Sequence, residues 1–379
     1  ILLVVAAALV AFGVRALNSL SVDAFPDVTN VQVQIATEAT GRSPEEVERF
    51  ITVPLEIAMT GLPGLTEMRS LNRNALSLIT LVFRDDVDVY FARQLVMERI
   101  IEVRSRLPED VSPILGPVST GLGEVYQYTL EKPSDKNTQL SEDELMERRT
   151  IQDWMVRPLL RSVAGVAEIN SQGGFERQYH IRVNPDRMRH YRVSLNQVYD
   201  ALARNNANSG GGILPTGSEQ YLVRGIGLIR SVEDIQNIVL KEEGGTPVYI
   251  KDVADVTIGS AVRVGALIKN GETEAVGGIV MMLRGGNAKD VVTRVKQRVA
   301  EINGKGMLPG GLQIVPFYDR TELVDAALWT VTKVLLEGIA LVVVVLFVFL
   351  GDLRSSLIVV ASLVLAPLVV GVMGALFER

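Results

Sequence analysis

The sequence predicts a membrane protein in which α-helical spans hold a large α+β domain outside the bilayer. Apolar runs occupy residues 1–17, 331–350 and 356–377, and each approaches or reaches the length that crosses a hydrocarbon core. The long stretch between the first two runs is charged and well patterned, as in a water-soluble domain. A composition of 47% hydrophobic and 22% charged residues matches spans joined to a soluble part.

The first apolar run is best explained as a truncated span. Residues 1–17 reach about 26 Å at 1.5 Å per residue, slightly short of a core of about 30 Å. A signal peptide is less favoured, because the run has no basic start and no convincing cleavage motif, and Arg15 can extend to the interface. Since the chain begins with Ile1 and ends on two charged residues after an apolar run, we expect it to be part of a longer protein.

The other two runs predict a pair of neighbouring spans. The link at residues 351–355 is short enough only for a tight turn, and residues 356–377 carry no charge. Arg354 in this link favours a cytoplasmic turn, because positive residues accumulate on the cytoplasmic side. The loop 18–328 then lies on the outer side, in the periplasm of a Gram-negative cell.

Composition and motifs exclude several classes of function. A net charge of −6 with one short basic run, at residues 187–192, gives no reason to expect nucleic acid as a partner. The chain has no cysteine and only two histidines, His180 and His190, which excludes disulfides, thiolate sites and a histidine-rich metal centre within it. Because no complete P-loop, nucleophile elbow, zinc-protease motif or dinucleotide fingerprint is present, we expect no enzyme activity.

The first part of the loop predicts a compact α+β unit. Ser43 and Glu46 form a capping box around Pro44, so a helix should start there and run toward Gly61, kinked at Pro54. Strands are expected at 31–35 and 77–83, and a helix at 90–107 whose apolar face includes Phe91, Leu95, Ile100 or Ile101, and Leu107.

A similar order of elements recurs later, which indicates duplicated βαβ modules. Strands are expected at 124–130, 179–183, 274–283 and 312–317, and helices at 141–163 and 289–302, the second with Val292, Val295, Val299 and Ile302 on one face. Between the repeats, Ser194 caps a short helix that ends near Arg204. The Asn/Gly-rich stretch that follows leads into a patterned strand, so a long hairpin arm over 205–222 is favoured over a flexible linker.

Two features of the sequence admit both a functional and a structural interpretation. Met281 and Met282 offer soft thioether ligands, but one of them packing in the core while the other faces the opposite side of a strand explains the pair better. Glu337 lies within or beside a span, where ionisable groups usually serve a function such as a proton pathway. Lys333, four residues earlier, makes a structural ion pair an equally good explanation.

Short motifs along the whole chain carry a family resemblance. They occupy residues 24–29, 54–56, 61–64, 69–73, 152–154, 205–208, 217–224 and 335–338. In this order they resemble the heavy-metal efflux branch of the resistance-nodulation-division (RND) transporters, and the resemblance extends over nearly the entire sequence.

The resemblance implies a fold of α-helical spans with α+β, ferredoxin-like (βαβ) periplasmic porter subdomains and an inserted docking subdomain. Residues 30–115 would form the first porter subdomain, and residues 120–182 with 266–318 the second. Residues 183–265 would be the docking subdomain, whose arm at 205–222 reaches into a neighbouring protomer. The arm residues singled out are Asn205, Asn206, Asn208, Gly210, Gly211, Gly212 and Pro215.

By the same resemblance, the chain would be the N-terminal part of a proton-driven, homotrimeric exporter in the bacterial inner membrane. Its cargo would be a divalent ion such as zinc, cobalt, cadmium or nickel, or monovalent copper or silver, passed to a periplasmic adaptor and an outer-membrane channel. No cofactor is implied apart from the transported ion. The proton relay and half of the metal cleft would lie outside this chain.

Within the chain, Glu124 and Glu168 fall in the expected second porter subdomain. We hypothesise that their carboxylates contribute to a site for a borderline cation such as Zn²⁺. Solvated acids at strand ends are an equally good explanation.

Three alternatives remain open. A multidrug exporter of the same superfamily would need more aromatic side chains than the 6% present. A protein-translocation accessory would have no obvious use for the arm, and a non-transporting metal-binding or adaptor module would not need three spans.

Overall fold

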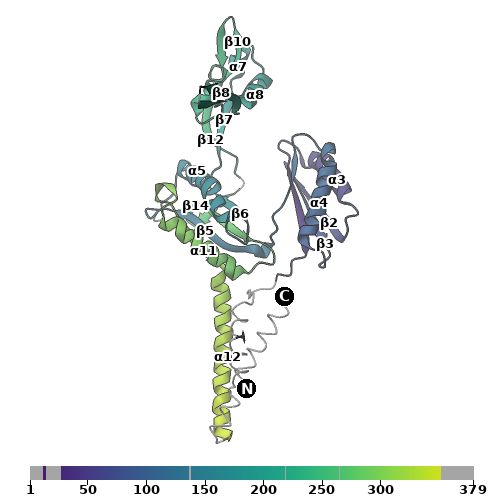
Figure 1. The fold of residues 1–379 in the computed structure, drawn as a ribbon, viewed down its shortest axis with the longest axis vertical. Helices are drawn as coiled ribbons and strands as arrows, with labels where there is room; N and C mark the ends of the chain where they lie inside the picture. The colour runs from purple at the N-terminus through teal and green to yellow at the C-terminus, as the bar shows by residue number, and fades with distance from the viewer. Residues whose placement is uncertain (1–11, 14–26, 136–137, 218, 264, 351–379) are drawn as a thin grey trace. The chain divides into compact units, whose positions relative to one another are not determined.

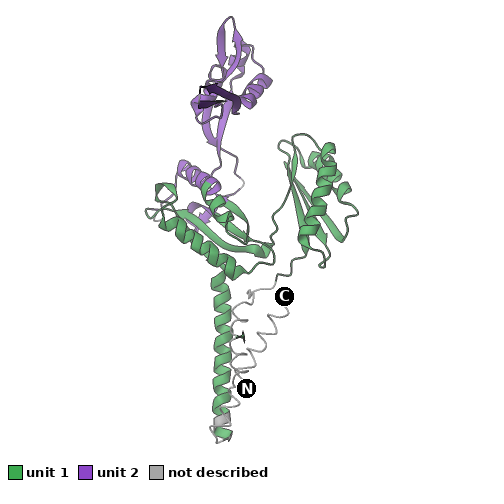
Figure 2. Ribbon diagram, viewed as in Figure 1, with its two compact units in different colours: residues 1–134, 155–171, 278–379 green, residues 135–154, 172–277 purple. Residues whose placement is uncertain are grey.

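The computed structural model describes residues 12–13, 27–135, 138–217, 219–263 and 265–350 (Figure 1). The predicted third span lies outside these residues, and so does the first apart from residues 12–13. The chain divides into two compact units, which Figure 2 colours separately. One contains residues 1–134, 155–171 and 278–379, and the other contains residues 135–154 and 172–277.

The first sheet, with its helices, makes up the part of the chain that we call the first module, residues 31–115. Its strands are antiparallel in the order β2-β3-β1-β4. The elements are β1 (Val31–Glu38), α2 (Pro44–Val47), a π-helical turn (Glu48–Thr52), α3 (Val53–Met59), β2 (Leu65–Arg73), β3 (Leu76–Phe83), α4 (Val89–Val103) and β4 (Ser112–Leu115). Alternate residues of β1 and β3 are buried against the helices, and this packing makes one hydrophobic core.

The predicted capping box is present, but the predicted kink takes another form. The Ser43 hydroxyl accepts a hydrogen bond from the Glu46 amide, and the Glu46 carboxylate accepts one from the Ser43 amide. Pro54 has no N–H to donate to the carbonyl four residues before it. The helix widens ahead of it into the π turn, where the Val53 amide bonds to the Glu48 carbonyl, five residues back.

The predicted apolar face of α4 is partly wrong. Its buried residues are Ala92, Val96, Ile100 and Val103. Phe91, by contrast, is 52% exposed, and Ile101 is 66% exposed. Asp88 caps the start of the helix. Apolar residues lie around much of the helix circumference, so the sequence did not show which face is buried.

The second sheet repeats this arrangement. Its strands run in the order β13-β14-β5-β15, and β6 also pairs with β14, so the path β6-β14-β5-β15 matches β2-β3-β1-β4 of the first module. The elements are β5 (Glu124–Glu131), α5 (Glu142–Ile151), a π turn (Gln152–Val156), α6 (Arg157–Arg161), β6 (Val166–Gly173), β13 (Leu267–Lys269), β14 (Thr273–Met282), α11 (Ala288–Gly304) and β15 (Gln313–Asp319).

Several expectations for this repeat are confirmed. The strands predicted at 124–130, 274–283 and 312–317 exist, and α11 buries Val292, Val295, Val299 and Ile302 as the periodicity indicated. Ser141 and Glu144 form the second capping box. Met282 is buried while its neighbour Met281 is only partly so, which agrees with the packing interpretation.

The inserted elements lie between β6 and β13. They are β7 (Arg177–Val183), α7 (Pro185–His190), α8 (Leu195–Arg204), β8 (Ser209–Thr216), β9 (Glu219–Gly225), α9 (Val232–Gln236), β10 (Val239–Glu243), β11 (Thr246–Tyr249), α10 (Ile250–Val253) and β12 (Ala254–Ser260). β7 pairs with β12, β10 with β11 and β8 with β9. The last pair confirms a hairpin in the predicted arm, and every described residue of both its strands is exposed.

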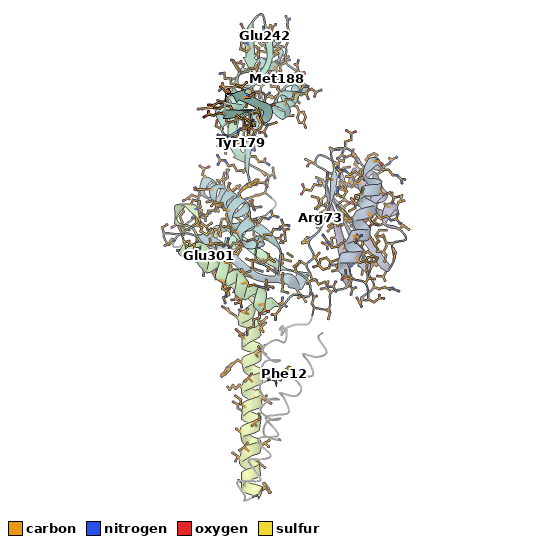
Figure 3. The ribbon with its side chains drawn as sticks, viewed as in Figure 1. Phe12, Arg73, Tyr179, Met188, Glu242 and Glu301 are labelled. Carbon is orange, nitrogen blue, oxygen red and sulfur yellow. The ribbon has the colours of Figure 1, made fainter. Side chains whose placement is uncertain are left out.

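Helix α12 (Arg320–Leu350) begins directly after β15, without an intervening residue. Among the described residues, its segment Arg320–Val345 is the one helix long and apolar enough to cross a membrane, judged by length and composition. Its first turn is buried at Arg320, Thr321 and Val324, whereas the apolar stretch that follows, drawn with its side chains in Figure 3, is not buried within the structure. The predicted span at 331–350 therefore lies within a helix that begins earlier.

Candidate functional site

Glu124, the first proposed metal ligand, opens β5. It follows a single 3₁₀ turn at Gly121–Gly123, and its side chain is partly buried. Its Oε2 accepts a hydrogen bond of 3.0 Å from Nε2 of Gln127. An amide donor orients a carboxylate but brings no positive charge to it.

Glu168, the second proposed ligand, is held in an ion pair. Its side chain is 16% exposed and lies 2.7 Å from Nη2 of Arg157 and 3.5 Å from Nη2 of Arg161. Glu168 stands on β6, which β14 separates from the strand of Glu124. Two guanidinium groups compensate its charge, so a metal ion would have to displace them first.

The described residues contain no group of three or more His, Asp or Glu side chains arranged to hold a metal ion. Glu337, proposed for the proton pathway, lies on α12 with its Oε1 3.9 Å from Nζ of Lys333. Both side chains are exposed, at 66% and 61%. This spacing is the i,i+4 ion pair that the sequence offered as the alternative to a proton site.

The asparagines of the arm brace its base. Asn205 caps the end of α8, and its Nδ2 donates to the Ala201 carbonyl at 2.8 Å. The Asn206 Oδ1 accepts from the Ile229 amide at 3.2 Å, and the Asn208 Oδ1 accepts from the Gly227 amide at 3.1 Å. The sequence predicted a hairpin, but not that Asn206 and Asn208 join the segment before β8 to the segment after β9.

The glycines and proline of the arm shape its strands. Gly210 and Pro215 pair with Arg224 and Gln220 across the hairpin, with a register shift between residues 210 and 213. Gly212 has φ +84°, which favours glycine, and a Cβ on Gly211 would come within 2.8 Å of Val223 Cγ1. The strands expose apolar side chains, namely Ile213, Leu214, Tyr221, Leu222 and Val223.

Sequence reasoning missed a buried charged cluster where α12 begins. Asp319 and Arg320 are 8% and 5% exposed. Asp319 pairs with Lys296 of α11 and accepts from the Thr321 amide at 2.8 Å. Burial alone would raise the pKa of Asp319, but the hydrogen bonds from Lys296 and Thr321 outweigh burial and hold that pKa below its ordinary value.

Tyr126 adds to this cluster. It lies on β5 opposite Asp319, and burial, with a contribution from the Asp319 charge, raises the pKa of its hydroxyl to about 12. An Asp-Arg-Thr sequence at the start of an apolar helix is a capping signal, but its long-range partners Lys296 and Tyr126 could not be found without the fold.

Comparison with known proteins shows the family to which the chain belongs. Residues 1–376 match the AcrB/AcrD/AcrF family. Protein HelA of Legionella pneumophila is 49% identical over 348 residues, which cover 91% of this chain and 32% of HelA. The cobalt-zinc-cadmium resistance protein CzcA of Cupriavidus metallidurans is 48% identical over 361 residues, which cover 94% of this chain and 33% of CzcA.

A solved structure agrees with the sequence comparisons. The crystal structure of a heavy metal efflux pump, crystal form II, superimposes with a TM-score of 0.89 at 37% identity, over 100% of this chain and 37% of that one. The chain thus spans about a third of the length of these relatives. The resemblance to the heavy-metal efflux branch of the RND transporters is confirmed, and the chain belongs to the AcrB/AcrD/AcrF family.

Proposed function

We propose that this chain is the N-terminal portion of a proton-driven heavy-metal exporter in the bacterial inner membrane. The observation that carries the proposal is the match to a heavy metal efflux pump along the full length of the chain. The loop 18–328 would stand in the periplasm, and α12 would enter the bilayer as the second span. Energy from proton flow would drive alternating access, in which rigid modules change their packing.

In this proposal the two repeated modules are porter subdomains of ferredoxin-like type. The first comprises residues 30–115, and the second comprises 120–182 with 266–318. The repeat of strand order between the two sheets supports this assignment. Residues 183–265 would form the docking subdomain that joins three protomers through the arm.

The proposed cargo is a divalent ion of the zinc, cobalt, cadmium or nickel group. The relative at 48% identity is named for resistance to cobalt, zinc and cadmium, and another at 40% for nickel, cobalt and cadmium. Copper or silver is the second choice within the same proposal. The ion would pass to a periplasmic adaptor and an outer-membrane channel.

We assign Glu124 to the metal path ahead of Glu168. A borderline cation such as Zn²⁺ accepts carboxylate oxygen ligands, and Glu124 carries a charge that no described ion pair compensates. Glu168 would join the path only in a state in which Arg157 and Arg161 have moved away. Glu337 is proposed for the proton pathway. Like Glu168, it would take part only in a state in which its ion-pair partner, Lys333, has moved away.

Reconstituting the full-length pump tests this function. Proteoliposomes with an imposed proton gradient should move zinc, cobalt or cadmium, detected with a metal-sensitive dye inside the vesicles. Collapsing the gradient with a protonophore is the matched control and should stop transport. Movement of an aromatic dye without movement of any metal would instead support the multidrug alternative and refute the metal proposal.

A further inference from the structure

Segments that are far apart in the sequence meet on the short stretch Val118–Gly123, which we call the connector because it links β4 to β5. The Arg284 amide, just beyond β14, donates to the Val118 carbonyl at 3.1 Å. Ser119 Oγ donates to the Met282 carbonyl at 2.8 Å. A Cβ on Gly123 would lie 3.1 Å from the same carbonyl, so the connector and β14 pack backbone to backbone.

The connector also holds the segment that leads into the first module. Thr120 Oγ1 donates to Asp27 Oδ2 at 2.8 Å. The Arg284 guanidinium donates to the carbonyls of Thr29 and Asn30 at 2.7 and 2.9 Å. Both backbone connections of the first module, before β1 and after β4, are therefore fastened at one place.

Helix α12 reaches the same place through Arg320. The Arg320 guanidinium donates through Nη1 to the carbonyl of Leu122, near the end of the connector. The start of the helix also pairs with α11, through Lys296–Asp319 and Lys289–Asp325, the second at 3.0 Å. The first turn of α12 is thus bonded to the connector as well as to α11.

A movement of α12 would reach the two modules by different routes. Because β15 continues directly into α12, a displacement of α12 reaches the second sheet through the backbone itself. The first module has no such backbone continuity with α12. Arg320 is 5% exposed, and a guanidinium that lost its acceptors would remain buried, so its bond to Leu122 should persist while α12 moves.

We propose that Arg320 is a positioning residue that couples α12 to the first module by way of the connector. This proposal rests on the proposed transport function, in which α12 shifts during the cycle. Arg320 transmits that shift to Leu122. The connector transmits it to the segments that precede β1 and follow β4 in the first module. Without Arg320 the second module would still follow α12 through the backbone, whereas the first module would follow only indirectly, through the bonds that join the connector and Arg284 to the second sheet.

Spin-label distances in the full-length trimer test the coupling. This chain contains no cysteine, so labels can be placed at chosen sites once any cysteines elsewhere in the pump are replaced. One pair joins Val331 on α12 to Leu71 on β2, which are 66% and 49% exposed. The reference pair joins Val331 to the exposed Gln297 on α11. Both pairs are measured in lipid nanodiscs without metal, in wild type and in Arg320→Met, Arg320→Lys and Arg294→Met.

We expect Arg320→Met to broaden the 331–71 distribution and to leave the 331–297 distribution unchanged. Arg320→Lys keeps an N–H donor and should restore the narrow distribution. Arg294→Met is the matched control, because Arg294 is exposed and donates to the Asp290 carbonyl within its own helix. An unchanged 331–71 distribution in Arg320→Met would overturn the proposal, and so would equal broadening of both pairs, which would show a purely structural role.

Transport gives the second measurement. Arg320→Met should slow zinc transport by about tenfold, a typical size for coupling between sites, while zinc binding and Arg294→Met transport stay at wild-type levels. Wild-type rates in Arg320→Met would count against the coupling. If the wild-type pump moves no metal, the proposed function fails by itself, and the spin-label distances still decide whether Arg320 links α12 to the first module.

Discussion

At the scale of single residues, Asp319 shows how a buried charge is built into this fold. Its carboxylate caps α12, accepts from Thr321 Oγ1 at 2.6 Å and pairs with Lys296. These interactions favour the ionised form, which is why its pKa is lowered despite burial. A group whose pKa is lower in the folded than in the unfolded protein stabilises the fold above its ordinary pKa, and that stabilisation is lost as the pH falls through the lower value.

Asp319→Asn should therefore destabilise the protein at neutral pH and matter less in acid. Asn still caps the helix, so the substitution removes mainly the charge, at a cost of about 1–3 kcal/mol. The difference in unfolding free energy between wild type and variant should be constant above about pH 5 and shrink below about pH 4. Thermal unfolding of the full-length pump between pH 3 and pH 7 measures it, and a difference that stays constant over that range would refute the account.

Glu124 and Glu168 should respond differently to replacement by glutamine. Glu124→Gln removes a proposed ligand charge while its neighbour Gln127 can still hydrogen-bond, so metal transport should fall by about tenfold or more at unchanged stability. Glu168→Gln removes the partner of two arginines, of which Arg157 is 42% exposed, so stability should fall by about 0.5–1 kcal/mol. Transport rates and melting temperatures of both variants, measured together, check this; equal transport in Glu124→Gln and wild type would remove Glu124 from the metal path.

At the scale of elements, the two modules share a local device as well as a strand order. In each, a five-residue π turn lies just before a proline, at Glu48–Thr52 before Pro54 and at Gln152–Val156 before Pro158. The residue four positions before each proline, Phe50 or Trp154, is an aromatic that is 48% or 79% exposed. The proline, which has no backbone N–H, cannot donate a hydrogen bond to the carbonyl of this aromatic residue. The same missing bond therefore accompanies the π turn in both modules.

Each module also places a crowded glycine before its outer strand. Gly64 and Gly165 have φ +76° and +92°, and a Cβ on either would meet a valine Cγ2, of Val87 at 2.7 Å or of Val291 at 2.6 Å. Gly61 has a similar φ of +80° but open space around it. Gly61 is therefore a matched control that carries the backbone cost without the crowding.

Alanine at these glycines should separate the two costs. Gly61→Ala should cost about 1–2 kcal/mol for a left-handed backbone, and Gly64→Ala or Gly165→Ala about 1–3 kcal/mol more because the valine must move. Chemical denaturation of the three variants gives the comparison. If Gly64→Ala and Gly61→Ala lose the same stability, the contact with Val87 has no energetic importance.

The elements also show which parts of the fold were predictable. Capping boxes at Ser43, Ser141 and Ser194 are local, so the sequence located the helix starts correctly. Strands β2, β4 and β6 were missed because edge strands are only half buried and their alternation is weak. The candidate site could not be predicted in full for a related reason. The ion pair of Glu168 with Arg157 and the bond of Arg320 to Leu122 are tertiary contacts, which no local sequence pattern encodes.

At the scale of the whole molecule, the exposed apolar side chains of the arm have no covering surface within the described part of a single chain. Both strands of the hairpin are exposed throughout, yet Asn206 and Asn208 fasten its base and Ile213, Leu214 and Leu222 are 61%, 58% and 73% exposed. A braced hairpin that exposes large apolar side chains costs free energy in water unless a partner covers it. The proposed homotrimer supplies such a partner, a second copy of the chain.

Replacing Ile213, Leu214 and Leu222 with serine should therefore weaken the trimer without unfolding the protomer. The lost apolar burial is of the order of 1.5–3 kcal/mol for each fully covered side chain, enough to shift a trimer toward monomers on dilution. Native mass spectrometry of the full-length pump in detergent, over a dilution series, measures the shift. Val262→Ser is the control, because Val262 is 96% exposed, lies outside the arm and should leave assembly unchanged. A triple variant that stays trimeric at every dilution would show that these side chains do not hold protomers together, and the exposed face of the arm would then require another partner.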